Sequence, residues 1–208
     1  MKTFVLFLLS LAPLYLLGQA VKLKKVKFKK SNLVKEQYYV LKKKKSIRHG
    51  EYLLLDANQM VKIQGQYKNN LKDGRWIYYK PNGHYAKVEY YTNGEKTGIW
   101  QKFVENGYAI ERYDHDNDQA LDPIIEVTIV YPPLAREKNV SGLVEIQVFF
   151  EEDCTIREMK SLSSVGTGCE EAVRDAVQRY VDLRHKYHLP IEECMEKEKT
   201  YRINFSLE

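Results

Sequence analysis

The hydrophobic pattern of the last third of the chain predicts one helix packed on a small sheet. Apolar residues take every second position from Val144 to Phe150, which predicts a strand with one apolar face. Residues 151–154 then form a turn, and residues 155–163 return as a less regular strand. From Cys169 to Tyr180 apolar residues recur every three or four positions, which predicts an amphipathic helix. Residues 200–207 alternate again, so the predicted order is β-β-α-β.

The start of this helix carries a candidate capping box. Thr167 and Glu170 have the spacing at which a hydroxyl and a carboxylate each satisfy a backbone N–H group of the first turn. Glu170 and Glu171 also place negative charge at the positive end of the helix dipole. These residues favour a helix start at this point.

A different pattern, with a period of 24 residues, runs through the first half of the chain. Glycines recur in register, aromatic residues follow two positions later, and further positions keep the same spacing. The recurring sets are Gly50, Gly74 and Gly98; Tyr52, Trp76 and Trp100; Leu55, Tyr79 and Phe103; Asn58, Asn82 and Asn106; and Tyr67 and Tyr91. Five positions that share one period indicate a structural repeat.

Each repeat unit predicts a β-hairpin. An aromatic strand runs from Arg75 to Lys80, the chain turns at Asn82-Gly83, and a second strand returns over residues 85–91. Asn-Gly is a strong hairpin signal because both turn residues must tolerate positive φ. An isolated hairpin is marginally stable, so neighbouring units are expected to bury one another's aromatic side chains in a meandering antiparallel sheet.

The pattern G-x-W-x-x-Y followed by N-G resembles the MORN-type repeats. The resemblance covers roughly residues 48–113, in two good units and one degenerate unit that keeps Gly50 and Tyr52 but has Gln59 at the turn glycine. It implies interaction and scaffolding rather than chemistry. The aromatic ladder is either only a packed core or also a face that binds sugar or peptide. The candidate residues of this face are Tyr52, Trp76, Tyr79, Trp100 and Phe103.

Composition and charge support two units with different roles. The 208 residues are 44% hydrophobic and 29% charged, which is typical of a folded chain of one large or two small domains. Residues 21–120 carry a net charge of +10, whereas residues 121–208 carry −6. We therefore expect a mainly β protein with an α+β part: an antiparallel hairpin-repeat sheet followed by a small β-β-α-β domain.

Two polar segments flank the repeats. The lysine-rich lead segment 21–47 suits a charged edge strand that resists pairing with another chain, or else attraction to anionic lipid or polysaccharide. In the acidic segment 114–127 the Asp-x-Asp-x-Asp spacing is that of a calcium loop, but Gln119 and Ile125 occupy the positions of the turn glycine and the bidentate glutamate. We expect a polar linker there, and no metal or other cofactor.

Residues 1–20 have the pattern of a secretory signal peptide. A lysine follows Met1, residues 4–17 carry no charge, and Gly18 and Ala20 are small residues at the two positions that precede a cleavage site. The uncharged stretch is shorter than the ~20 apolar residues of a membrane span. We expect export and cleavage after Ala20, with an uncleaved anchor as the alternative. An exported chain is not expected to bind nucleic acid.

The sequence from Tyr131 is similar to the C-terminal domain of TonB family proteins. The resemblance spans about residues 128–208 and rests on a Tyr-Pro and Ala lead-in, a glycine before the alternating strand, an acidic hairpin and an acidic helix start. These positions are Tyr131, Pro132, Ala135, Gly142, Asp153, Glu171 and Ala172. The chain departs from the family at Cys154, which replaces a hairpin glycine, and in lacking the tryptophan-plus-proline signature after the helix.

This resemblance implies a module that binds a peptide by strand addition, as the family does with the box segment of outer-membrane receptors. The last strand is the candidate partner-binding edge, unless it is covered or guarded by Lys199 and Arg202. Its residues are Thr200, Tyr201, Arg202, Ile203, Asn204, Phe205 and Ser206.

The expected function is a non-enzymatic binding module of the periplasm or cell envelope of a Gram-negative bacterium, with an outer-membrane receptor or another envelope protein as its partner. A scaffold that binds wall glycan or anionic membrane through the repeats is the alternative. Energy transduction for TonB-dependent transport is a further alternative if the N-terminal segment is an uncleaved anchor.

Three cysteines in an exported chain allow one disulfide. If the last strand lies beside the first strand of the small sheet, the helix returns toward Asp153 and Cys154, and the chain leaves again near Cys194. This topology predicts a Cys154–Cys194 disulfide and a free Cys169.

The sequence carries no pattern that points to catalysis. It contains no G-x-S-x-G motif, and His185 and His188 lack the H-E-x-x-H motif or a third ligand of a zinc site. We expect both histidines to be surface or packing residues, and the chain not to be an enzyme.

Overall fold

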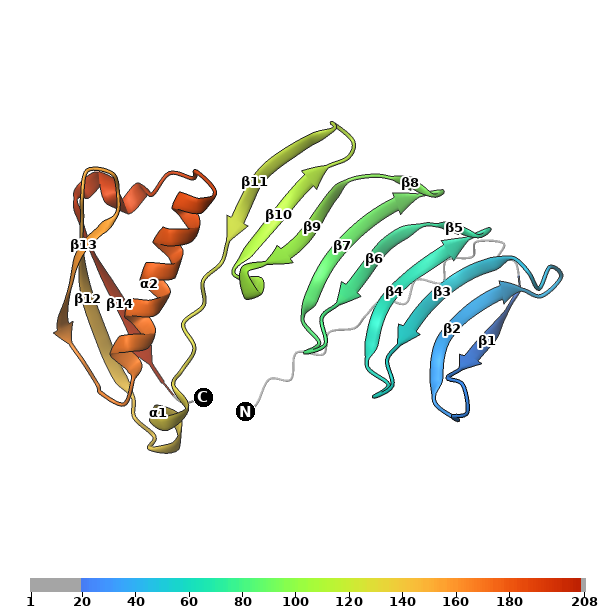
Figure 1. The fold of residues 1–208 in the computed structure, drawn as a ribbon, viewed down its shortest axis with the longest axis horizontal. Helices are drawn as coiled ribbons and strands as arrows, with labels where there is room; N and C mark the ends of the chain where they lie inside the picture. Colours follow the sequence, from blue (N-terminus) through green and yellow to red (C-terminus); the bar gives the residue numbers. More distant parts are fainter. Residues whose placement is uncertain (1–19, 207–208) are drawn as a thin grey trace, which may run out of the picture.

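The computed structural model describes residues 20–206, which form two units (Figure 1). One is an antiparallel sheet of eleven strands, and the other is a three-stranded sheet with a helix packed against it. Half of the residues lie in strands and 17% in helices, which confirms the predicted mainly β fold with an α+β part. The predicted signal peptide lies, except for Ala20, outside the described residues. No helix within residues 20–206 is long and apolar enough to cross a membrane.

The large sheet is a meander in which the main strands follow one another in chain order. Its strands are β1 (Val21–Lys27), β2 (Val34–Leu41), β3 (Arg48–Leu55), β4 (Val61–Lys68), β5 (Leu71–Lys72), β6 (Gly74–Tyr79), β7 (Tyr85–Thr92), β8 (Glu95–Lys96), β9 (Ile99–Val104), β10 (Ala109–Asp114) and β11 (Gln119–Ile125). The short strands β5 and β8 extend two of the turns by pairing with β4 and β7. A 3-10 turn, η1 (Glu105–Gly107), joins β9 to β10.

The hairpin predicted around Asn82-Gly83 is present. Strands β6 and β7 pair antiparallel on either side of this turn, and Gly83 has a φ of 83°, a value that glycine adopts without strain. Asn93 and Gly94 also have positive φ at the next turn. The turn chemistry therefore places the strands as the repeat predicted.

The sheet extends beyond the repeats on both sides, which corrects two expected boundaries. The lysine-rich segment supplies β1 and β2, and β1 forms the outer edge of the sheet, as the edge-strand interpretation requires. The acidic segment is not a linker: residues 115–118 turn the chain, and β11 pairs with β10. The Asp114 carboxylate accepts hydrogen bonds from the N–H groups of Asp116 and Asn117, so the acidic run forms an Asx-type turn.

The small unit has the predicted β-β-α-β order (Figure 1). A short helix α1 (Pro133–Glu137) leads into β12 (Gly142–Phe150) and β13 (Ile156–Ser163), then α2 (Cys169–Lys186), the 3-10 helix η2 (Glu192–Glu196) and β14 (Glu198–Phe205). The sheet order is β13-β12-β14, so the last strand lies beside the first. Helix α2 packs through Val173, Val177 and Val181 on the buried face of this sheet.

The predicted capping box does not form at the start of α2. The residue before the helix is Gly168, with a φ of 86°, and no side chain caps the first turn. Thr167 itself has a φ of 54°, and its hydroxyl donates to the carbonyl of Gly166. Because the backbone enters the helix through this left-handed pair, the Thr167 side chain satisfies its own turn instead of the helix.

In the large sheet, side chains pack mainly against side chains of neighbouring strands. Trp76 is 2% exposed because its ring lies on Gly65 of β4, where a β-carbon would overlap the ring. Tyr52 and Tyr67 contact the same ring, with centroids 5.5 and 4.9 Å away. This close approach of a backbone and an aromatic ring is the best-buried point of the sheet.

We predict that Gly65→Ala destabilises the protein. The added methyl group must displace the Trp76 ring, and overpacking of this kind lowers the free energy of unfolding by about 1–3 kcal/mol. Urea unfolding measures this change. Lys62→Ala, at an exposed position of the same strand, is the matched control and should stay within about 0.5 kcal/mol of the parent chain. Equal stability of the two variants would contradict the packing described here.

Candidate functional site

Strand β14 forms one edge of the small sheet. Among residues 20–206 it pairs with β12 alone, in an unbroken antiparallel register from Gly142↔Phe205 to Phe149↔Glu198. The predicted edge is thus open along its outer side. Ser206 follows the strand and is exposed.

The register shows which backbone groups of β14 face outward. The N–H group of Phe150 donates to the carbonyl of Lys197 at 3.0 Å, so these two opposite residues form a hydrogen-bonded pair. Hydrogen-bonded and non-hydrogen-bonded pairs alternate in an antiparallel ladder. The alternate residues from Lys199 to Phe205 therefore bond to β12. The residues between them, Thr200, Arg202 and Asn204, direct their N–H and C=O groups toward the open edge.

The side chains of β14 divide between the two faces of the sheet. Phe205 is buried in the core, and Tyr201 and Ile203 pack against that core from partly exposed positions. On the opposite face, Arg202 donates to its cross-strand partner Glu145 at 2.6 Å. The charge expected to guard the edge is thus neutralised by the central strand.

The lead-in motif supports the end of β14. The Tyr131 ring lies 5.4 Å from the Phe205 ring, and its hydroxyl donates to the carbonyl of Val140. Ala135 is fully buried in the same core. Pro132 immediately precedes α1, and Gly142, with a φ of 140°, begins β12 against Val165. These residues act as packing and turn positions in the structure.

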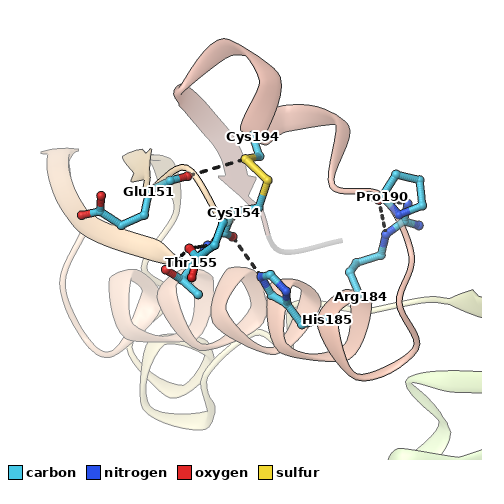
Figure 2. Close-up of a disulfide and its surroundings, with 8 residues drawn as sticks. Glu151, Cys154, Thr155, Arg184, His185, Pro190 and Cys194 are labelled. Carbon is cyan, nitrogen blue, oxygen red and sulfur yellow. Dashed lines mark hydrogen bonds between the residues drawn. A yellow bond between two sulfur atoms is a disulfide. The ribbon is translucent and has the colours of Figure 1, made fainter.

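A disulfide fixes the segment from which the chain enters β14 (Figure 2). The predicted Cys154–Cys194 bond is present and joins the β12–β13 turn to η2. From α2, His185 donates to the carbonyl of Cys154 at 3.1 Å, and the Arg184 guanidinium binds the carbonyl of Pro190. These three links hold the residues before β14 on the rest of the small unit.

Cys169 is buried and forms no disulfide within the described chain, as predicted. Burial raises the pKa of its thiol, which keeps it in the unreactive protonated form. The histidine prediction also holds for His185, whose ring contacts the turn at Cys154 rather than a group of potential ligands. Within residues 20–206 no three His, Cys, Asp or Glu side chains lie together as a metal site would require.

The repeat aromatics lie on opposite faces of the large sheet. Tyr52, Trp76 and Trp100 belong to one face, which we call the ladder face. Tyr79 and Phe103 lie on the other face, where both contact Tyr85, with centroid distances of 5.6 and 5.7 Å. The five candidate residues therefore do not form one binding surface.

The ladder face repeats its contacts every 24 residues. The Trp76 indole N–H donates to the carbonyl of Gln66, and the Trp100 indole N–H donates to the carbonyl of Tyr90. A cation four residues before each ring lies over it, with distances to the centroids between 4.5 and 5.6 Å. These cations are Arg48 over Tyr52, Lys72 over Trp76 and Lys96 over Trp100.

This cation series was missed in the sequence, although the same self-alignment contains it. Arg48, Lys72 and Lys96 are 24 residues apart, but they stand among many other lysines. Cation–π contacts of this kind contribute about 0.5–1 kcal/mol each at exposed sites. The cations therefore belong to the packing of the repeats and explain part of their basic charge.

A buried carboxylate lies at the centre of the ladder face. Glu89 is 3% exposed, and its oxygens bind Lys87 at 2.5 Å, Lys72 at 3.5 Å and the hydroxyl of Tyr91 at 2.9 Å. Burial alone would raise the pKa of Glu89, but the hydrogen bonds from Lys87, Tyr78 and Tyr91 hold it below its usual value. Burial also lowers the pKa of Lys72. The network makes Glu89 a structural anion, with its charge matched by two lysines.

Compared with known proteins, the chain matches no protein-family model, no curated protein and no solved structure. The two family resemblances of the sequence therefore stay predictions.

We predict that loss of the disulfide destabilises the small unit. The bond closes a loop between residues 40 positions apart, and such bonds contribute about 2–4 kcal/mol. A Cys154→Ser and Cys194→Ser double variant should unfold at lower urea concentration by this amount. Reductant should lower the stability of the parent chain but not that of the double variant. An unchanged parent chain would contradict the prediction.

We predict that Glu89→Gln lowers the free energy of unfolding by about 1–3 kcal/mol at pH 7, because two lysines lose their anionic partner. The folded pKa of Glu89 is depressed, so its contribution is complete above the unfolded value of about 4.3 and is lost as the pH falls through the folded value. The difference between the variant and the parent should therefore shrink in acid. Exposed Glu95→Gln is the control, and a pH-independent difference would argue against the network.

Proposed function

We propose that the chain is a protein-binding module that captures an extended peptide by strand addition to β14, with the large sheet as its scaffold. The observation that carries this proposal is the row of outward backbone groups at Thr200, Arg202 and Asn204. An edge of this kind offers alternating donors and acceptors that a peptide backbone can match.

The second edge of the small sheet, β13, is less suited to the same task. Its register with β12 shifts twice, next to Glu145 and next to Phe150, whereas the register of β14 is continuous. Register shifts of the bulge type twist a strand and interrupt pairing, and natural proteins use them to protect edges. The regular edge is therefore the better template for an added strand.

The faces of β14 indicate how an added peptide would be read. Side chains of the peptide that lie on the helix side would meet Tyr201 and Ile203, which are partly exposed beside the core. Those on the other side would meet the Arg202–Glu145 pair. We infer that the preferred peptide alternates apolar and polar residues.

The resemblance to TonB family proteins supports an envelope partner, such as an outer-membrane receptor, and an exported chain. Energy transduction would require an anchor in residues 1–19, and binding at β14 is compatible with either a cleaved or an uncleaved leader. The scaffold alternative receives less support, because the ladder rings pack on one another and β1 has the position of a guarded edge.

A proline at the open edge tests the proposal. Asn204→Pro removes an outward N–H group while the ladder to β12 keeps its hydrogen bonds, so the fold should persist. Peptides selected on the full chain from a displayed library of random twelve-residue sequences serve as the probe. We predict that Asn204→Pro weakens their binding at least about tenfold, measured by fluorescence anisotropy.

Asn204→Ala is the matched control, because it removes the side chain and keeps the N–H group, and it should bind within about threefold of the parent. Hydrogen exchange should show new protection at residues 198–205 when a peptide binds. Selection of no peptide, protection of β13 instead, or equal binding by the two variants would overturn the proposal.

A further inference from the structure

A pocket of about 480 Å³ opens between the large sheet and the end of α2. Its lining includes Trp100, Tyr113, Ala120 and Pro123 from strands β9–β11, and Tyr187, the residue that follows α2. Most of the lining is apolar. Figure 1 shows α2 between this end of the large sheet and the small sheet, so the pocket lies on the opposite side of the helix from β14.

The pocket lies where the aromatic ladder stops. Twenty-four residues after Lys96 stands Ala120, and twenty-four residues after Trp100 stands Ile124, so the next rung has neither its cation nor its ring. Trp76, in the middle of the ladder, is 2% exposed, whereas Trp100 remains partly exposed. The last rung thus leaves part of an aromatic surface without the neighbour that the earlier rungs have.

Both walls of the pocket are held in place by contacts between the units. The Tyr187 hydroxyl donates to Glu111 at 3.3 Å, Lys186 pairs with Glu105, and the Arg179 guanidinium lies 4.6 Å from the Tyr108 ring centroid. A ligand would therefore enter a preformed site and would not have to order the two units first.

The polar groups at the rim are already paired with one another. Lys87 binds Glu89 at 2.5 Å, Lys102 binds Glu111 at 3.1 Å, and the Tyr113 hydroxyl donates to Asp118 at 2.6 Å. An ionic ligand would find its counter-charges occupied. A sugar would find few free partners for its hydroxyls, and buried hydroxyls without partners are costly. A flat apolar ring makes no such demand.

We propose that this pocket binds an aromatic side chain, phenylalanine or tryptophan, of a partner polypeptide. The ring would take the place of the missing rung against Trp100 and Tyr113, with Tyr187 as the opposite wall. The ladder face continues from the pocket past Lys87 to Tyr78, 4.3 Å apart, which gives the residues flanking such an anchor a surface to follow. Buried aromatic anchors of this kind carry much of the energy of protein interfaces. The site is independent of strand addition at β14.

The two tryptophans supply the test, because each gives one indole N–H signal in the NMR spectrum of the full chain. The probe is a seven-residue glycine–serine peptide with one central phenylalanine, titrated to millimolar concentrations. The Trp100 signal should shift and saturate, while the signal of buried Trp76 stays unchanged. The same peptide with a central leucine should bind at least about threefold more weakly, since it lacks ring–ring contacts.

Two substitutions should change this response in opposite ways. Ala120→Phe, at an exposed position, should fill the pocket and abolish the shift. Tyr187→Ala should weaken binding about tenfold through loss of one wall, whereas Tyr187→Phe keeps the ring and should stay within about threefold. Asn204→Pro should leave the Trp100 response intact, so failure here and failure of strand addition are distinguishable.

The remaining outcomes overturn the proposal. These are an unshifted Trp100 signal, equal binding of the leucine peptide, or an unchanged response in Ala120→Phe. Saturation by chitotriose but not by the peptide would instead identify a sugar site. Equal binding of benzyl alcohol and the peptide would identify a pocket for small aromatic molecules.

Discussion

The fold depends on the contact between the Trp76 ring and the bare backbone of Gly65. Within residues 20–206 the large sheet has no second layer of strands or helices over most of its area (Figure 1). A sheet of this kind cannot bury its side chains between layers, so it must bury them between neighbouring strands. The ring reaches the backbone only because residue 65 has no side chain, and Tyr52 and Tyr67 then close around it.

The remaining contacts of the ladder face follow from this requirement. Arg48, Lys72 and Lys96 cover rings that would otherwise face water, and Glu89 neutralises two lysines at the centre. The repeat therefore conserves electrostatic contacts as well as aromatic ones from unit to unit. It also explains how a chain rich in lysine forms a wide sheet without a thick apolar core.

Most of the secondary structure was predictable because it follows local patterns. The Asn82-Gly83 turn requires positive φ, and the alternation from Val144 to Phe150 assigns one face of β12 to a core. The Cys154–Cys194 bond followed from strand order alone. The errors arose where local signals compete. Asp114 served a turn rather than a linker, and Thr167 bonded within its own turn rather than capping α2.

The candidate sites were harder to predict because they depend on three-dimensional placement. The sequence indicated the last strand of the small sheet, but only the register shows that Thr200, Arg202 and Asn204 face the open edge. The pocket at Trp100 combines strands β9–β11 with Tyr187, more than sixty positions later in the chain. No local pattern announces such a pairing of distant segments.

The parity of β14 has a consequence for how this edge can change over time. The residues whose main-chain groups are exposed carry their side chains on the solvent face, away from the core that holds Phe205. Substitutions at these positions leave the interior undisturbed and keep the main-chain groups available. Drift in sequence along this strand would thus retain a general affinity for extended chains, while selectivity for one sequence would have to come from the neighbouring, less variable residues.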